Sequence, residues 1–220
     1  MRCWSFRATD PGAGERPDLQ FVPPMLRRRL SRLAASALSV AKTCLGEDQG
    51  IPVIFASRHG ELARTVEILT SLAHDEPPSP TAFSLSVHNS STGLLGMIRG
   101  DRAASTAIAA GNLTLVMGML ETILQAGAAD GRALLVYADE PLPVAYSDAS
   151  RPQDTEVALA VLLDTTMKGM VLSKNGATRP APDLGRQAHT LVALLEGRAD
   201  SVELGDSEQA WQVTKNACVA

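Results

Sequence analysis

Residues 86–141 read SVHNSSTGLLGMIRGDRAASTAIAAGNLTLVMGMLETILQAGAADGRALLVYADEP, and this stretch decides the fold class. Apolar and small residues recur at helical spacing over 90–98 and 113–126, which predicts two helices. The runs over 104–110 and 134–138 are short and apolar, which predicts buried strands. Helices that alternate with buried strands are typical of an α/β domain with helices layered on a sheet.

Upstream of this stretch the same alternation continues. A proline at the first helical position and a glycine at the end predict one helix from Pro24 to Gly46. An apolar run predicts a buried strand over 51–56, and a further helical pattern predicts a helix over 61–74. The side chains that we expect to point inward from this last helix are Leu62, Val66, Leu69 and Leu72.

Downstream, two apolar runs over 156–165 and 169–173 predict an antiparallel pair joined near Met167 and Lys168. A helical pattern follows over 183–196. The tail contains two short apolar pieces, 202–204 and 211–213, which fit an edge strand or a flexible end.

The length and composition bound the organisation of the chain. Its 220 residues, 45% of them hydrophobic, suffice for one globular domain with a substantial core. Residues 1–23 carry several glycines and prolines and predict an extended, loose lead-in. The domain is then expected over 24–220. A loose end is one interpretation of the tail from about residue 200.

Charge and hydropathy exclude several classes of function. The net charge of −4 provides no overall basic field for nucleic acid. No apolar run approaches the ~20 residues of a membrane-spanning helix, so we expect no membrane insertion. The N-terminus has no apolar signal core. The cysteines, Cys3, Cys44 and Cys218, are scattered, which predicts no metal site and favours a reducing cytoplasm.

The stretch Ser57-Arg58-His59-Gly60-Glu61, directly after a predicted strand, matches the short signature of histidine phosphatases, in which the histidine attacks phosphorus. Such chemistry needs a second histidine at a strand end and further arginines around the phosphate. The candidates for that histidine are His74, His88 and His189. None of them has the required setting, so His59 is better interpreted as a strand-end residue that caps the next helix or lines a loop.

Residues 86–141 resemble the central part of the N-terminal half of β-ketoacyl synthases, which have the thiolase-like fold. The matching positions are Asn89, Gly93, Gly100, Ser105 and Ile108. The resemblance implies a layered αβα domain with a mixed sheet, in which the strand from Ser105 delivers Gly111 and Asn112 to an elbow that opens a buried helix.

The residue that this resemblance places at the nucleophile position is Asn112. A ketosynthase needs a thiolate there to take the acyl chain from its carrier protein. An amide cannot form that thioester, and the two histidine loops of the family's C-terminal half have no counterpart. The resemblance therefore implies a truncated ketosynthase-like domain without activity of its own and without a cofactor, working as part of an acyltransferase complex.

Two groups within this superfamily are more similar still. Chain-length factors, the inactive partners of ketosynthases, usually carry Gln at the elbow, and Asn112 is a shorter amide. The blocks FASRHGEL, SPTAFSLSVHN, IAAG and LLVYADEPLP resemble short proteins of bacterial aryl polyene clusters that contain only the N-terminal half. This resemblance covers about residues 20–165.

Several site residues are implied by the resemblance. The central interface strand would pair with a full-length β-ketoacyl synthase in a heterodimer, with a homodimer or monomer as alternatives. Its interface residues would be Ser105, Thr106, Ala107, Ile108, Ala109, Ala110, Gly111 and Asn112. The residues implied to shape the acyl pocket are Leu115, Val116, Met117, Met119 and Leu120, for which ordinary helix core is the alternative.

Three further groups have a functional and a structural interpretation. The arginines Arg27, Arg28, Arg29 and Arg32 are candidates to meet an acidic acyl carrier protein, or they form a solvated helix face. His88 and Asn89 are expected to satisfy loop backbone groups near the elbow. Asp139 and Glu140 follow a strand, and a turn is a better interpretation than acid–base chemistry.

These observations favour a non-catalytic, chain-length-factor-like subunit that stabilises an active ketosynthase and shapes its elongation pocket, in polyene or fatty-acid-like chain extension on an acyl carrier protein. A stand-alone hydrolase that uses His59 is the alternative from another class. A scaffold or acyl-binding remnant without an enzyme partner is a third, and a large exposed apolar patch would favour the heterodimer over that remnant.

Overall fold

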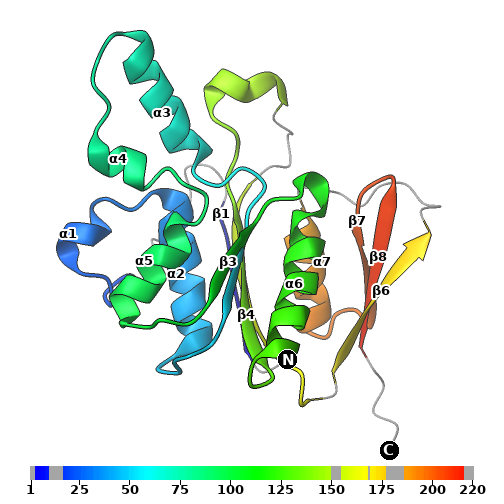
Figure 1. Ribbon diagram of the computed structural model, residues 1–220. Coiled ribbons are helices and arrows are strands. Elements are labelled where there is room, and N and C mark those ends of the chain that lie inside the picture. The colour runs from blue at the N-terminus through cyan, green and yellow to red at the C-terminus, as the bar shows by residue number, and fades with distance from the viewer. Residues whose placement is uncertain (1–2, 10–16, 150–154, 168, 177–185, 216–220) are drawn as a thin grey trace, which may run out of the picture.

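A mixed sheet forms the centre of the computed structural model, which describes residues 3–9, 17–149, 155–167, 169–176 and 186–215 (Figure 1). Its strands are β1 (Cys3–Thr9), β2 (Val53–Ala56), β3 (Ser105–Ile108), β4 (Arg132–Asp139) and β5 (Glu156–Asp164). They lie in the order β1-β5-β4-β2-β3. The strand β2 is parallel to β3 and to β4, whereas β5 is antiparallel to β4 and to β1.

Helices cover both faces of this sheet (Figure 1). One face carries α2 (Arg32–Leu45) and α5 (Ser90–Arg99), and the other carries α6 (Thr114–Ala128) and α7 (Gln187–Leu195). Because successive side chains of a strand point to opposite faces, Ile54 packs with α6 and α7 while Phe55 packs with α2. Burial on both faces explains why the strands read as continuous apolar runs.

A second, antiparallel sheet lies beyond α7 (Figure 1). Its strands are β6 (Met170–Gly176), β7 (Ser201–Gly205) and β8 (Gln209–Lys215), in the order β6-β8-β7. Leu191 and Leu194 of α7 share one core with Leu159 of the large sheet and with Leu204 and Val213 of the small one. The expected αβα layering with a mixed sheet is confirmed, and the small sheet adds a fourth layer.

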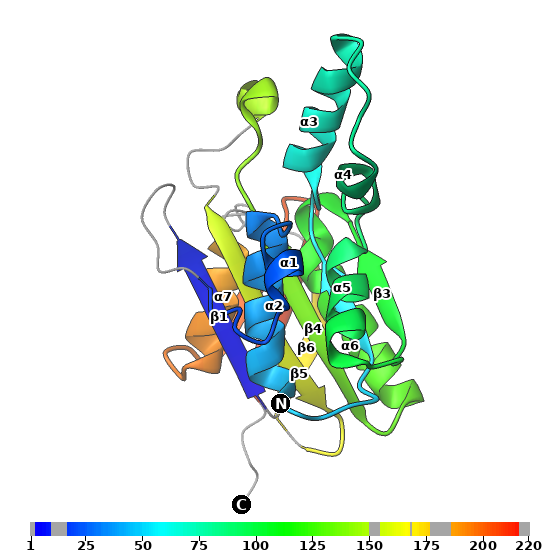
Figure 2. The ribbon, with the colours of Figure 1, turned by 90° about the vertical axis from the view of Figure 1, so that its left-hand side faces the viewer.

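The remaining elements lie outside these layers. They are α1 (Pro24–Arg27), α3 (Leu62–Ala73), α4 (Pro80–Ser84) and two 3-10 turns, η1 (Gly111–Leu113) and η2 (Val144–Ala149). Figure 2 shows that α3 projects from the body, with α4 at its side. Of the helices in the described part of the chain, none combines the length and apolarity needed to span a bilayer.

Two expectations about strand pairing are wrong, and the structure decides between the two interpretations of the tail. Part of the lead-in expected over 1–23 is the strand β1, which pairs with β5 along its whole length instead of lying loose. The strand β6 does not pair with β5, because its antiparallel partner is β8. The tail, interpreted as an edge strand or a flexible end, contains the edge strand β7 and its partner β8, so residues 201–215 are held in a sheet. Both errors concern pairings between segments that are distant in sequence, β1 with β5 and β6 with β8.

Two helix predictions also need correction. The single helix expected from Pro24 is split: α1 ends at Arg27, and α2 begins after Ser31, whose hydroxyl accepts a hydrogen bond from the Ala34 amide at 2.9 Å. In α3 the side chains expected to point inward are not buried, and Leu69 and Leu72 are exposed. The apolar face of α3 is therefore left uncovered by the chain's own core.

Candidate functional site

The elbow between β3 and α6 is a tight turn built by Gly111 and Thr114. Gly111 has a φ of +54°, in the left-handed region that glycine adopts without steric cost. The Thr114 hydroxyl accepts a hydrogen bond from the Ala110 amide at 2.9 Å and donates one to the Gly111 carbonyl at 2.7 Å. This pair of bonds fixes the direction in which α6 leaves the sheet.

Asn112 occupies the middle of this elbow and is half-buried. Its backbone carbonyl accepts a hydrogen bond from Gln187 Nε2 at 3.0 Å. The side-chain oxygen of the same glutamine accepts one from the Gly205 amide, also at 3.0 Å. The buried Gln187 therefore ties the elbow to α7 and to the small sheet, a connection that no local sequence pattern indicates.

The helix behind the elbow lies very close to the sheet. A Cβ atom on Gly118 would lie 2.7 Å from the Ala56 Cβ and 3.0 Å from Leu135 Cδ1, so only glycine fits there. Of the residues implied to shape an acyl pocket, Leu115, Val116 and Met119 are buried in the chain's own core. Leu120 and Met117 are half-buried, and Met117 packs against the edge of that core.

The residues implied to form the interface lie together on the open edge of the large sheet. The strand β3 pairs with β2, and no described strand pairs with its other edge. The Val53 amide donates to the Ala104 carbonyl and the Ser57 amide to the Ile108 carbonyl. Because backbone groups alternate in direction along a strand, those of Ser105 and Ala107 point toward the open edge.

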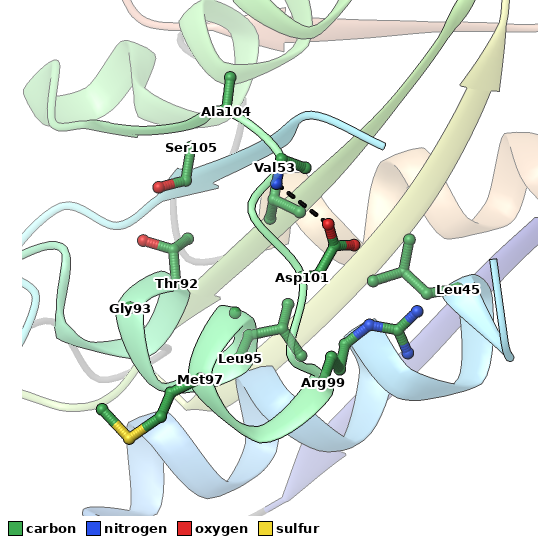
Figure 3. Close-up of a pocket in the computed structure, with 12 residues that line it drawn as sticks. Leu45, Val53, Thr92, Gly93, Leu95, Met97, Arg99, Asp101, Ala104 and Ser105 are labelled. Atoms are coloured by element: carbon green, nitrogen blue, oxygen red, sulfur yellow. Dashed lines mark hydrogen bonds between the residues drawn. The ribbon is translucent and has the colours of Figure 1, made fainter. Parts of the chain in front are cut away.

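A cavity of about 210 Å³ lies between α5 and the start of β3. Figure 3 shows Thr92, Leu95 and Ser105 among the side chains around it. Its two charged residues bind backbone groups of nearby loops. Arg99 donates to the Gly46 carbonyl at 2.8 Å, and an Asp101 oxygen accepts from the Ala103 amide at 3.0 Å. The charged groups on this wall are therefore already engaged inside the chain.

A buried ion pair holds the loop that follows β2. Asp139, the last residue of β4, is 2% exposed and accepts four hydrogen bonds. The donors are Ser57 Oγ at 3.0 Å, the Arg58 amide and Arg58 Nε at 2.8 Å each, and the Tyr137 hydroxyl at 2.6 Å. Asp139 was expected to be a turn residue, and instead it anchors the ends of two strands.

The same ion pair bears on the histidine-phosphatase interpretation. Arg58, which such an enzyme would aim at a phosphate, is nearly buried and its Nε binds Asp139. His59 is exposed, and His74 lies at the far end of α3, where its Nδ1 is 2.8 Å from the Thr70 carbonyl. The structure therefore gives no support to phosphate-ester chemistry at His59.

His88 supports the loop from the other side. Its Nε2 lies 2.9 Å from the Ser57 carbonyl, and its ring meets the Phe55 ring edge-on, with centroids 5.6 Å apart. A Cβ on Gly60 would lie 2.7 Å from the His88 ring, so the glycine allows this packing. Asn89 is exposed, and its carbonyl accepts a hydrogen bond from the Thr92 hydroxyl at 3.0 Å.

A cationic cavity of about 510 Å³ lies among α2, α3 and α4. The charged side chains that line it are Arg28, Arg29, Arg32, Arg64, Glu67 and Glu140. Arg32 is engaged with Glu156 at 2.7 Å, and Arg64 Nε lies 3.4 Å from Glu61. Burial raises the pKa of Glu140 to about 7, with contributions from the nearby Glu61 and Glu156. At neutral pH the cavity is therefore more positive than its formal charges suggest.

Comparisons with known proteins agree with this geometry. The sequence profile described as "Beta-ketoacyl synthase, N-terminal domain" matches residues 2–213. A search of curated proteins finds no match. A chain in the structure "Ketosynthase (ApeO) in Complex with its Chain Length Factor (ApeC) from Xenorhabdus doucetiae" is 27% identical, with a TM-score of 0.79. The match covers 88% of this chain and 81% of that chain, so the two are of similar length.

A β-ketoacyl synthase from Burkholderia phymatum STM815 has a TM-score of 0.57 at 13% identity, and the match covers 85% of this chain and 58% of that one. This second likeness concerns the fold alone. The family profile, in contrast, runs through the elbow, both faces of the large sheet and most of the small one. The chain therefore belongs to the family of β-ketoacyl synthase N-terminal domains and has their thiolase-like fold.

Proposed function

We propose that this chain is a non-catalytic, chain-length-factor-like subunit that pairs with an active β-ketoacyl synthase. The proposal rests on the elbow, because the resemblance of residues 86–141 to ketosynthases assigns Asn112, and not a cysteine, to the position of the family's nucleophile. An amide nitrogen is too weak a nucleophile to accept an acyl group from a thioester. The chain then contributes structure to a reaction whose covalent step takes place on its partner.

The buried Cys44 offers no substitute nucleophile. Cys44 lies on α2, on the face of the large sheet opposite α6, and its Sγ donates to the Ala160 carbonyl at 3.7 Å. Burial raises the pKa of this thiol, with the neighbouring Cys3 adding to the effect. A thiol whose pKa is raised stays protonated at neutral pH and is unreactive.

The open edge of β3 supports the pairing. An edge strand with outward backbone groups is a template for another strand, and small side chains allow a close approach. The residues proposed for this contact are Ser105, Thr106, Ala107, Ile108, Ala109, Ala110, Gly111 and Asn112. The relative from Xenorhabdus doucetiae belongs to a complex of a ketosynthase with its chain length factor, which is the type of assembly that we propose.

The proposal extends to the acyl chain and its carrier. Leu115, Val116 and Met119 would act from the core by fixing the position of α6, and Leu120 would lie nearer the partner's pocket. An acidic acyl carrier protein would meet the cationic cavity, where Arg28 and Arg29 are exposed, as is Arg32, which already pairs with Glu156. Arg27 is less suited, since it binds the Val22 carbonyl at 2.9 Å. The proposed setting is polyene-type chain extension in the cytoplasm.

Co-expression with the ketosynthase encoded nearest to this chain tests the pairing, with native mass as the readout. We expect a one-to-one complex. Ala107→Pro should abolish it, because proline removes the outward amide of β3, whereas Ala107→Ser keeps that amide and should preserve the complex. A wild-type chain that stays monomeric beside the ketosynthase would contradict the proposal.

The catalytic assignment needs a separate measurement. After incubation of the complex with an acyl-loaded carrier protein, the intact mass of each subunit shows where the acyl group resides. We expect the added mass on the ketosynthase alone. An acyl adduct on this chain would show that it has a nucleophile of its own and would overturn the non-catalytic assignment.

A further inference from the structure

The helix α3 has an apolar face that the described chain covers only in part, since Leu62 and Val66 are half-buried and Leu69 and Leu72 are exposed. Leu62, Val66, Leu69 and Leu72 recur at helical spacing, yet α3 has no buried residue. Leu69 and Leu72 are 53% and 51% exposed. The main neighbour of α3 is the short helix α4. A helix with so regular an apolar stripe normally buries that stripe against another element.

The segment that follows α3 has the same character. Phe83 of α4 is 63% exposed, and Val87, just before α5, is exposed as well. We call residues 62–87 the arm. Its prolines, Pro77, Pro78 and Pro80, restrict the backbone of the connection between α3 and α4. The arm therefore presents large apolar side chains from a helical hairpin whose connection is restrained by prolines.

The arm lies on the same side of the molecule as the open edge of the sheet. Figure 2 shows α3, α4, α5 and β3 along one side, with β1 on the opposite side. The helices that flank β3 on the two faces of the sheet add Met97 from α5 and Leu124 from α6, which are 73% and 60% exposed. Exposed apolar side chains thus accompany the edge strand from the arm to α6.

The strand β3 is too short to form a stable interface without exposed apolar side chains on neighbouring elements. A stable protein–protein interface buries about 800 Å² on each partner and involves about 20–30 residues a side. The strand β3 has only four residues, and the backbone groups of two of them point outward. Strand pairing alone is too small, so a stable interface at this edge has to include neighbouring elements. Large apolar side chains at its centre would supply most of the affinity.

We propose that the arm is a second anchor of the same interface, buried against an apolar surface beside the edge strand of the partner ketosynthase. This inference rests on the proposed function, since it takes the partner of β3 to be that ketosynthase. Leu69, Leu72 and Phe83 are the anchors. The contact makes the pairing depend on side chains of the arm as well as on the backbone of β3.

The test compares two sets of substitutions in the full chain, with the dissociation constant of the complex as the readout. Leu69→Lys with Leu72→Lys changes the arm. Val171→Lys is the matched control, because Val171 is an exposed apolar residue of β6, in the small sheet. We expect the arm variant to bind at least ~30-fold more weakly, as for loss of a hot spot, and the control to stay within about twofold.

Hydrogen exchange on the wild-type complex gives a readout that needs no variant. Amides of residues 62–87 should become protected when the ketosynthase binds, while those of β6 should not change. Since the substituted leucines are exposed, circular dichroism and the unfolding midpoint of the free arm variant should match those of the wild type. These measurements separate a lost contact from a lost fold.

The outcomes distinguish this inference from the proposed function. If Ala107→Pro abolishes binding while the arm variant binds like the wild type, the arm inference is overturned and the pairing through β3 stands. If the wild-type chain does not bind the ketosynthase but self-associates, and the arm variant is monomeric, the occupant is a second copy of this chain. That result would overturn both the inference and the proposed function.

Discussion

The helices α6 and α3 look alike in sequence and end up in opposite environments. Both have apolar residues at helical spacing, and both follow a strand that ends in a glycine-containing turn. In α6 the stripe is buried against the large sheet, with Leu115 and Val116 in a core to which α7 also contributes. In α3 no residue is buried. The apolar period of a helix thus indicates that one face needs cover, and the surroundings decide whether the chain itself provides it.

The largest effect should come from the ion pair between Arg58, which follows β2, and Asp139, at the end of β4. Asp139→Ala leaves Arg58 nearly buried without its carboxylate, and removing one partner of such a pair costs about 3–5 kcal/mol of unfolding free energy. Urea denaturation measures the loss. The control is Asp48→Ala, since Asp48 forms a half-exposed pair with Arg132 at 2.9 Å. We expect that variant to lose at most about 1 kcal/mol. Equal losses would contradict the assigned role of Asp139.

The same substitution, leucine to alanine, in α6 and in α3 tests the comparison between the two helices directly. Leu115→Ala should cost about 2–5 kcal/mol, because it opens a cavity in the core behind the elbow. Leu69→Ala should change the unfolding free energy of the isolated chain by less than about 0.5 kcal/mol, because the side chain is exposed. Chemical denaturation of both variants is the measurement. A loss above 2 kcal/mol for Leu69→Ala would show that the free chain covers α3 after all.

Two glycines of α6 test how closely this buried helix approaches the sheet. Gly118→Ala places a Cβ against Ala56, so we expect a loss of about 1–3 kcal/mol from overpacking. Gly127→Ala is the matched control, because no atom lies within 4 Å of its new Cβ. It should stabilise the helix by roughly 0.5–1 kcal/mol. Thermal unfolding midpoints that move in the same direction would contradict the close approach of α6 to the sheet.

The smallest expected effect is a pH dependence at the base of the arm. Glu140 has a pKa near 7 in the folded state, above its ordinary value of 4.5, because it is buried near other carboxylates. The folded state then binds the extra proton between these values, so the stability should fall as the pH rises from about 4.5 to 7. We expect Glu140→Gln to remove on the order of 1–2 kcal/mol of this fall.

Unfolding curves at pH 5 and pH 8 measure that difference for the wild type and for Glu140→Gln. The raised pKa of Glu61, also due to burial, acts in the same direction and should leave a residual slope in the variant. A wild-type stability that rises from pH 5 to pH 8 would show that Glu140 is ionised in the folded state at little cost.

Much of the site was accessible from local sequence. The strand and helix around the elbow, the glycine that turns it and Asn112 at its centre all follow from patterns within a few residues of each other. The family resemblance was carried by the same stretch and agrees with the profile that matches residues 2–213. Gln187, in contrast, lies 75 residues from the elbow that it holds, and no pattern around it signals that bond.

By itself the sequence determined the period of each apolar stripe, the turns enforced by glycine and proline, and therefore the kinds of element and their order. Only the tertiary structure decided that β1 covers β5, that β6 pairs with β8, that Asp139 holds Arg58 and that α3 stands uncovered. The physical reason is range. Helical and strand periods arise from neighbouring residues, whereas strand partners, buried ion pairs and covered faces depend on which distant segments meet.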